Sequence, residues 1–580
     1  MKIKLLSIST FLVCSFANAQ IGSVKSYQKI SAVEGNFSGT LLNNAEFGHV
    51  CAIGDLNNDG IQDYAAGSPG GNEVFVLIMA ADMKVLSYTT ININTENFGF
   101  DLLDGDQFGM DVASLGDLDN DGVSDLAIGA DQVNGSGAVF IVLLNNDGSL
   151  KSTIKIASGE TNCPTLNAGD EFGKVISNMG DFFGDGINDI AISASKDDDG
   201  GTDKGAFYIC NLVTNGIISS FSKVSATSGG FAGDLSDGDE FGHVSNMGDF
   251  NNDGITDLAV GAVKDDDGGT DYGAIWLLSM NANGTVSQQK KISRSEGNFT
   301  GFLNTDDNFG YDIAMPGDLN LDGVNDLVVG AFNDDDGGLD IGAVWVLFLQ
   351  ANGNIELFKK INRLEGNFSA DLDYNDGFGK YIDAIGDIDN DSIGDLAISA
   401  DMDDDGGNNK GAFYLINVDY CPIPTAVFTY TVTGNFGTFT APDVVGANFY
   451  WYFDDGFYSY EDNPEHEFYT SGNHYVCLTT TDACGSNTYC TTIQTSGNST
   501  GLGTANFPSK INYTIQNQQI ILENILVKNE VVLRDLSGKI ILQKKISPSD
   551  SMIDISKLAA GVYNLSILGG KGYSTMVVVN

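Results

Sequence analysis

Residues 108–130 read Phe108-Gly-Met-Asp-Val-Ala-Ser-Leu-Gly-Asp-Leu-Asp-Asn-Asp-Gly-Val-Ser-Asp-Leu-Ala-Ile-Gly-Ala130. An alternating segment runs from the Phe-Gly pair to Gly116, an acidic loop follows, and a short apolar segment ends at Ala130. Alternation and short apolar runs are typical of strands, and Asp, Asn and Gly are typical of turns between them. The segment therefore predicts two β-strands joined by an acidic loop.

The same unit recurs along the chain. Each copy begins with Phe-Gly, at Phe47, Phe108, Phe172, Phe241, Phe309 and Phe378. Two more strand-like runs follow in most copies, as at 342–349 and 358–368, and four strands per unit match a propeller blade. We predict an all-β chain that begins with a six-bladed β-propeller. A seven-bladed ring and an open solenoid are the alternatives.

The N-terminal segment favours a closed ring. Residues 27–37 resemble residues 289–299 and 358–368, which are fourth strands of interior units, and no such strand follows the sixth unit. We predict that residues near 26–38 complete the last blade, since this removes the open sheet edges that a solenoid would have to cap.

The acidic loop has a spacing that suits calcium. In the second unit, Asp117, Asp119, Asp121 and Asp125 stand at positions 1, 3, 5 and 9, and Gly122 stands at position 6. Alternate side chains of a tight loop converge, and the carbonyl at position 7 can add a ligand. The alternative is a set of metal-free Asx-turns. We expect Ca²⁺, because several carboxylates within nine residues repel one another unless a cation neutralises them.

The six loops supply the candidate ligands, with Phe183 replacing the third-position oxygen in the third unit. The candidates are Asp55, Asn57, Asp59, Ile61 and Asp63; Asp117, Asp119, Asp121, Val123 and Asp125; Asp181, Asp185, Ile187 and Asp189; Asp249, Asn251, Asp253, Ile255 and Asp257; Asp318, Asn320, Asp322, Val324 and Asp326; and Asp387, Asp389, Asp391, Ile393 and Asp395.

A second acidic motif, Asp-Asp-Asp-Gly-Gly, precedes the third strand of units three to six. It begins at Asp197, Asp265, Asp334 and Asp403. Such a motif forms either a solvated turn or a rim that binds a cation or a ligand. The sequence leaves both readings open.

The composition excludes several classes of function. There are 28 Lys plus Arg against 78 Asp plus Glu, a net charge of −50, which excludes electrostatic binding of nucleic acid or anionic membranes. The chain has four His, so a hydrolase mechanism would have to rest on carboxylates, and the clustered carboxylates belong to the repeated loops. We expect His49 and His243, next to Phe-Gly pairs, to be strand residues.

Residues 1–19 resemble a secretory signal peptide, with Lys2 and Lys4, an apolar run and Ala17-Asn-Ala19 before Gln20. No later apolar run has the length of a membrane helix, so we expect export without a transmembrane anchor. Seven Cys remain after Cys14, too few to form a disulfide framework.

Residues 20–420 resemble the FG-GAP β-propeller of integrin α chains, on the Phe-Gly pairs and Asp loops of all six units. The resemblance implies calcium loops on one face and partner binding on the opposite face or the rim. Integrin propellers have seven blades, so the family's ligand surface does not transfer to this count of six.

Two small β-sandwich domains are expected after the propeller. Residues 421–495 resemble a PKD-type immunoglobulin-like domain, on Trp451-Tyr-Phe-Asp-Asp-Gly456, Asn463-Pro464 and Gly472-Asn-His-Tyr-Val-Cys477. We predict a cross-strand disulfide between Cys477 and Cys490 there, and Cys421 with Cys484 is the other candidate pairing.

A Gly/Ser/Thr-rich linker at 496–505 precedes residues 506–580. These resemble the C-terminal sorting domain of the type IX secretion system, on Asp535-Leu-Ser-Gly-Lys539 and Leu558-Ala-Ala-Gly-Val-Tyr563, with Phe507-Pro-Ser509 in place of the usual Pro-Asn-Pro start. The resemblance implies handling by the type IX machinery, removal of the module, and attachment to the bacterial outer surface or release.

The expected function is a secreted, calcium-binding, non-enzymatic propeller that binds a glycan or a surface or matrix protein in adhesion or capture. A surface polysaccharide-processing lyase or esterase and a passive surface-layer component are the alternatives.

Overall fold

The computed structural model describes residues 22–419, 424–444, 446–482 and 485–496, and further strands and short segments between 513 and 579. Regular structure in this part of the chain is almost all strand, with two short 3₁₀ turns, η1 (Pro69–Gly71) and η2 (Val133–Gly135). No helix within these ranges is long and apolar enough to cross a membrane. The strands fall into two compact units, β1–β24 and β25–β38, and each is described by itself.

The first unit consists of antiparallel sheets of four strands each. In chain order of their inner strands, the sheets are β2 (His49–Gly54), β3 (Asp63–Ser68), β4 (Glu73–Met79) and β5 (Val85–Ile91); β6 (Val112–Gly116), β7 (Asp125–Ala130), β8 (Ala138–Leu144) and β9 (Leu150–Ala157); β10 (Phe172–Gly180), β11 (Asp189–Ala194), β12 (Ala206–Leu212) and β13 (Ile218–Ser225); β14 (Phe241–Asn246), β15 (Leu258–Ala262), β16 (Ala274–Met280) and β17 (Val286–Ile292); β18 (Ile313–Gly317), β19 (Asp326–Ala331), β20 (Ala343–Leu349) and β21 (Ile355–Ile361); and β22 (Phe378–Gly386), β23 (Asp395–Ala400), β24 (Ala412–Asp419) and β1 (Ser23–Ser31).

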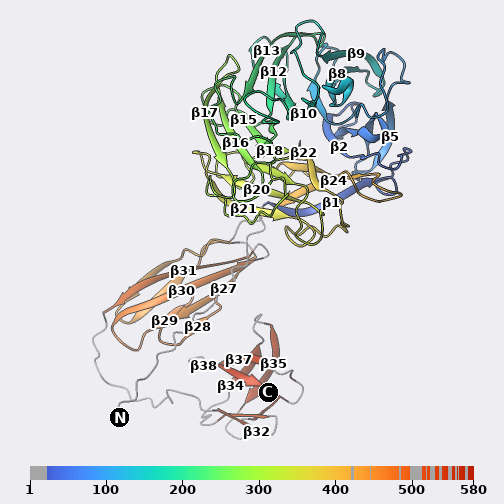
Figure 1. The fold of residues 1–580 in the computed structure, drawn as a ribbon. Helices are drawn as coiled ribbons and strands as arrows, with labels where there is room; N and C mark the ends of the chain where they lie inside the picture. Colours follow the sequence, from blue (N-terminus) through green and yellow to red (C-terminus); the bar gives the residue numbers. More distant parts are fainter. Residues whose placement is uncertain are drawn as a thin grey trace, which may run out of the picture. The chain divides into compact units, whose positions relative to one another are not determined.

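These sheets follow one another around a ring (Figure 1). The innermost strands β2, β6, β10, β14, β18 and β22 each contact the next, and β22 contacts β2. Apolar side chains of neighbouring sheets pack against each other between them. We refer to the sheets as 1 to 6 in the order given, and to their acidic loops as loops 1 to 6.

The repeated Phe-Gly pair has a packing role and a backbone role. All six Phe side chains of these pairs are fully buried. Gly48 has φ +135°, and a Cβ atom there would lie 2.4 Å from the carbonyl oxygen of Ala412. Only glycine accommodates both the conformation and this close approach of the chain.

The N-terminal strand closes the ring as the sequence predicts. Strand β1 pairs with β24, with Ser23 opposite Asp419 and Ile30 opposite Phe413. It begins and ends earlier than the expected range of 26–38. The following segment instead places Phe37 in the core, stacked on Phe47 at a ring distance of 4.8 Å.

The expected PKD-type region forms two facing sheets. One contains β25 (Thr429–Thr433), β26 (Phe436–Thr440) and β29 (Glu465–Glu467), and the other contains β28 (Tyr458–Ser459), β27 (Asn448–Phe453), β30 (Gly472–Asp482) and β31 (Gly485–Thr495). Trp451 is fully buried in their common core. The predicted Cys477–Cys490 disulfide is confirmed and joins β30 to β31. Cys421 and Cys484 lie outside the described residues, as do residues 1–19.

The C-terminal region also contains two sheets. They are β32 (Tyr513–Gln516), β33 (Gln519–Leu522) and β36 (Met552–Asp554), and β35 (Ile540–Ile546), β34 (Asn529–Arg534), β37 (Gly561–Leu568) and β38 (Tyr573–Val579). All pairings are antiparallel.

Candidate metal loops

Each acidic loop joins the first strand of its sheet to the second. Because the inner strands occupy equivalent places in the ring, all six loops lie at the same end of it. Each loop therefore gathers its own set of the ligand residues that the sequence predicts.

The loops are folded by their own Asp side chains. In loop 2, the Asp117 carboxylate accepts the N–H groups of Asp121 and Gly122, both at 2.8 Å, and Asp121 accepts the N–H of Val123 at 3.0 Å. Equivalent bonds form in loop 3, where Asp181 accepts the N–H of Asp185 at 2.7 Å. These bonds therefore do not depend on a third-position ligand, which loop 3 lacks.

The ninth-position Asp has a structural task that the spacing did not indicate. Asp125 is fully buried, and its carboxylate accepts the N–H of Leu118 at 2.9 Å and the N–H of Leu144 at 3.0 Å. It ties the loop to the third strand of the sheet. Burial raises the pKa of Asp125 to about 6. The same bonding to the third strand occurs at Asp63, Asp189, Asp257, Asp326 and Asp395.

Loops 2 and 6 offer a donor set for a hard cation. Carboxylate oxygens of Asp117, Asp119 and Asp125 lie within 4.8 Å of one another, and those of Asp387, Asp389 and Asp395 do likewise. Oδ1 of Asp119 and Oδ1 of Asp389 are buried without a hydrogen-bond partner among the described residues. Clustered carboxylate oxygens are the ligands that Ca²⁺ prefers, so the residues fit that ion.

The other loops carry an amide at the third position, except loop 3. Asn57 donates a hydrogen bond from Nδ2 to Asp59 at 2.9 Å, and Asn320 donates one to Asp322 at 3.1 Å. An Asn can present its side-chain oxygen to a metal instead after a flip of the amide. Loops 1, 4 and 5 therefore keep an oxygen donor at the third position, but each carries one negative charge fewer than loop 2 or loop 6.

The second acidic motif binds a cation supplied by the chain itself. In sheets 3 to 6, the first and third Asp of the motif clamp a lysine ammonium of the outermost strand. The pairs are Lys223 with Asp197 and Asp199 at 2.8 and 3.0 Å, Lys291 with Asp265 and Asp267 at 2.7 and 2.6 Å, Lys360 with Asp334 and Asp336 at 2.5 and 2.5 Å, and Lys29 with Asp403 and Asp405 at 2.7 and 2.8 Å.

An aromatic ring of the third strand completes each clamp. The ammonium lies 5.0 Å from the ring centre of Trp345 for Lys360 and 5.4 Å from that of Trp276 for Lys291. The motif is thus a lysine clamp, neither a bare solvated turn nor an open rim for an external ion. The signal in the sequence is Lys, a β-branched residue, then Ser or Asn at the end of the outermost strand, as in Lys360-Ile-Asn362.

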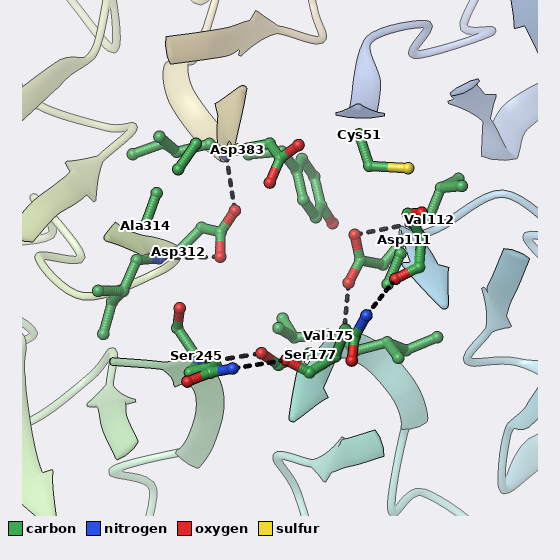
Figure 2. A pocket seen from close by; sticks show the side chains of 18 of the residues that line it. Cys51, Asp111, Val112, Val175, Ser177, Ser245, Asp312, Ala314 and Asp383 are labelled. Atoms are coloured by element: carbon green, nitrogen blue, oxygen red, sulfur yellow. Dashed lines mark hydrogen bonds between the residues drawn. The ribbon is translucent and has the colours of Figure 1, made fainter. Parts of the chain in front are cut away.

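A cavity of about 270 Å³ lies among the innermost strands. Asp111, Asp312 and Asp383 line it from different sheets (Figure 2). Each carboxylate accepts a backbone N–H of the next sheet: Asp111 from Ile176 at 2.6 Å, Asp312 from Ile382 at 2.6 Å, and Asp383 from Ala52 at 2.8 Å. They join neighbouring inner strands.

The sequence led us to expect clustered carboxylates in the repeated loops, but these three carboxylates lie outside the loops and line one cavity. Burial raises the pKa of Asp111 to about 7 and that of Asp383 to about 6, and it raises the pKa of Asp312 well above its usual value. In the sequence they are isolated Asp residues in three of six units. Their proximity depends on ring closure, so no local spacing could indicate it.

His49 and His243 are buried structural residues, as expected. His49 stacks on Tyr381 at a ring distance of 3.7 Å, and its Nδ1 contacts the carbonyl of Met110. Nδ1 of His243 bonds to the carbonyl of Tyr311 at 2.5 Å, and burial lowers the pKa of His243 to about 3. His466 and His474 bind Asp455 and Asp454 at 2.8 and 2.9 Å.

A ring of four-stranded antiparallel sheets with an acidic loop after each inner strand defines a β-propeller. Comparison with protein families specifies it further. Residues 108–142 and 286–348 match FG-GAP repeat models, and residues 507–580 match the secretion system C-terminal sorting domain. The chain therefore carries FG-GAP repeats and a type IX sorting domain, and that domain indicates secretion and attachment at the outer surface.

Curated relatives include integrin α chains. The chain is 30% identical over 230 residues to integrin alpha-5 of Xenopus laevis, covering 37% of this chain and 20% of that protein. It is 34% identical over 173 residues to integrin alpha-4 of Xenopus laevis, covering 28% and 15%. The chain thus spans about a fifth or less of the length of these relatives.

Solved structures resemble separate parts of the chain. The PKD1 domain of the Vibrio cholerae metalloprotease PrtV is 31% identical over 13% of this chain and 99% of its own, with a TM-score of 0.12. The extracellular domain of a hybrid two component system from B. thetaiotaomicron is 11% identical over 82% of this chain and 59% of its own, with a TM-score of 0.30. The fold described above rests on this chain's own strands.

Proposed function

We propose that the protein is a calcium-stabilised, non-enzymatic adhesion or ligand-binding protein with a six-bladed propeller, displayed on the outer surface of the cell. The observation that carries this proposal is the set of carboxylate loops at one end of the ring, two with an unpartnered carboxylate oxygen. The expected ligands in loops 1 to 6 would hold the ions.

Calcium would act by stabilising the folded ring. Ions that bind only the folded state add RT ln(1 + [L]/Kd) per site, so sites with Kd of ~10⁻⁴ M would together add several kcal/mol at millimolar calcium. Loop 3 lacks an oxygen at Phe183, and it is the weakest of the six in this proposal.

Non-enzymatic binding is favoured over hydrolysis because the carboxylates of the Asp-Asp-Asp-Gly-Gly motifs and of the cavity are already engaged. Lysines hold those of the Asp-Asp-Asp-Gly-Gly motifs, and backbone N–H groups hold Asp111, Asp312 and Asp383. A general acid or nucleophile has to be free to exchange protons or bonds with a substrate.

The PKD-type sandwich offers a surface for a glycan. Tyr450 and Tyr452 of β27 and Tyr475 of β30 are exposed on the outer face of its four-stranded sheet. The Tyr450 ring lies 5.5 Å from that of Tyr460. Exposed aromatic clusters mark interaction sites, and tyrosine combines an apolar ring with a hydroxyl, as sugar recognition requires.

The proposed function is tested by a ligand-binding screen and an assay for polysaccharide cleavage. The full chain, and a Tyr450→Ala/Tyr452→Ala variant, would be screened against glycans and matrix proteins with calcium and with chelator, beside a polysaccharide depolymerisation assay. We expect retention of a glycan that the variant loses, whereas chelator should lower the melting temperature of the propeller. Depolymerisation would establish the enzyme instead, and the absence of binding and turnover would favour a passive surface role.

A further inference from the structure

Every outermost strand of the ring begins with a bulge. In each pairing with the third strand the register shifts by one residue near the start, as between Leu143 and Leu144 in the pairing of β8 with β9. The extra residue occupies the same place in all six sheets. These bulge residues are Leu86, Lys151, Ser219, Ser287, Glu356 and Lys25.

The two lysines among them reach the acidic loop of their own sheet. Lys151 Nζ lies 2.5 Å from an oxygen of Asp119 and 2.5 Å from one of Asp121. Lys25 Nζ lies 2.6 Å from Asp389 and 2.7 Å from Asp391. Each ammonium bridges the third and fifth positions of its loop.

Lysine and the third-position residue vary together. The loops with a bulge lysine are those with Asp at the third position, Asp119 and Asp389. The loops that face Leu86, Ser287 and Glu356 have Asn57, Asn251 and Asn320 there. The additional carboxylate therefore occurs together with an additional internal cation.

The ammonium occupies an oxygen that calcium would use. Oδ1 of Asp121 accepts the N–H of Val123, so Oδ2 is the oxygen left for a metal, and Lys151 binds Oδ2. Asp391 is placed in the same way, with Oδ1 on the N–H of Ile393 and Oδ2 on Lys25. Calcium has to displace the lysine from this oxygen or accept a positive charge beside it.

We propose that Lys151 and Lys25 are built-in competitors of calcium that divide the loops into two classes. Loops 2 and 6 are held together by lysine when calcium is scarce and take up the ion only at higher concentration. The Asn-type loops 1, 4 and 5 have no such counterion and fill first. This inference rests on the proposed calcium binding of the loops.

A single substitution separates the two roles of the lysine. Lys151→Met removes the competitor, so calcium binding to loop 2 should tighten roughly tenfold, as expected for removing a unit charge beside a divalent ion. It also leaves four loop carboxylates without a counterion. The variant should therefore melt below the wild type in chelator and above it in millimolar calcium.

The measurements are calorimetric calcium titration and scanning calorimetry of the full chain. Lys155→Met is the matched control, because Lys155 lies on the same strand β9, over the ring of Phe140 and away from the loop. We expect its shift in melting temperature to be the same with and without calcium.

Conversion of one loop class into the other gives an independent measurement. Asp119→Asn with Lys151→Ser turns loop 2 into an Asn-type loop and should add one site to the tight class. Asn57→Asp with Leu86→Lys should move loop 1 into the weak class.

The outcomes separate this inference from the calcium proposal. If the wild type binds no calcium, the proposed function fails, whatever the lysines do in chelator. If the wild type binds calcium and Lys151→Met neither tightens a site nor reverses the sign of its melting shift, the lysines are ordinary surface ion pairs and the inference is wrong.

Discussion

The Asp401 carboxylate lies 2.6 Å from the ammonium of Lys380, and the Asp401 side chain is wholly inaccessible to solvent. Nε2 of His49 lies 3.5 Å from the same carboxylate. Burial alone would raise the pKa of Asp401, but the charge of Lys380 and the contact with His49 hold it below its usual value. The ionised pair is therefore part of the folded ring.

Removing one partner should be strongly destabilising. Lys380→Met leaves a buried, uncompensated carboxylate, and we expect a loss of about 3–5 kcal/mol in the free energy of unfolding. The double variant Lys380→Met/Asp401→Asn should recover part of that loss. Chemical unfolding of the three variants measures the coupling, and additive losses would contradict a direct pairing.

The lysine clamps should carry stability in the same manner. Lys360→Met strips the buried Asp334 of its ammonium and removes a charge from the face of Trp345. We expect a loss of about 3 kcal/mol and a changed Trp fluorescence spectrum. Lys359→Met, on the neighbouring position of β21, is the control, and an equal loss there would show that the clamp adds nothing.

The cavity carboxylates predict a pH dependence with a definite sign. The pKa of Asp383 is raised to about 6 by burial, so between its ordinary value and pH 6 the folded state binds a proton that the unfolded state has lost. Its contribution to stability is present at low pH and is lost as pH rises through 6.

Asp383→Asn should remove that dependence. The variant keeps an acceptor for the Ala52 N–H, and above pH 7 it should be more stable than the wild type by about 1–3 kcal/mol. Unfolding in chelator at several pH values measures the difference, with exposed Asp101→Asn as control. If the wild type and the variant have parallel pH profiles, the pKa of Asp383 is the same in the folded and unfolded states, and the prediction is wrong.

The closing strand should be essential to the ring. Deleting residues 23–31 exposes the edge of β24, and we expect aggregation, measured by light scattering. The milder change Ile30→Ala, at a fully buried position, should cost about 2–4 kcal/mol. Val33→Ala at an exposed position is its control, and a monomeric deletion variant with unchanged melting would refute closure by β1.

The sorting domain predicts a processing event. We expect the surface form to lack residues 1–19 and roughly the last 75 residues, because the expected signal peptide and the sorting domain would both serve as addresses for export. Intact-mass measurement of the native surface protein tests this. Asn580 still attached to the surface form would contradict it.

Three features could be predicted because short stretches of sequence reveal them: the repeat, the loop spacing and the closing strand, which resembles the fourth strands of other units. Phe47 and its five counterparts repeat with the sheets, and Asp117 to Asp125 form one loop whose residues are consecutive. The Cys477–Cys490 pairing followed from two neighbouring strands. Such features need no knowledge of which sheet lies beside which.

The lysines and the cavity acids could not be predicted in this way. Lys360 is distant in sequence from Asp334 and meets it only when β21 pairs with β20. Asp312 meets the N–H of Ile382 only after two sheets are placed side by side. The role of the cavity acids depends on tertiary placement alone, whereas the clamp lysines carry a short sequence signal, as in Lys360-Ile-Asn362, whose meaning becomes clear only once the strands pair.

The pairing of Ser23 with Asp419 also sets an order of folding. The two residues come from opposite ends of the propeller sequence, so this pairing closes a very long loop of chain and carries a correspondingly large entropic cost. Neighbouring sheets can form as the chain emerges, but the sixth remains one strand short until the first segment returns to it. The ring can therefore close only once the chain through β24 is available to pair with the N-terminal strand, so closure is the last step in forming the propeller.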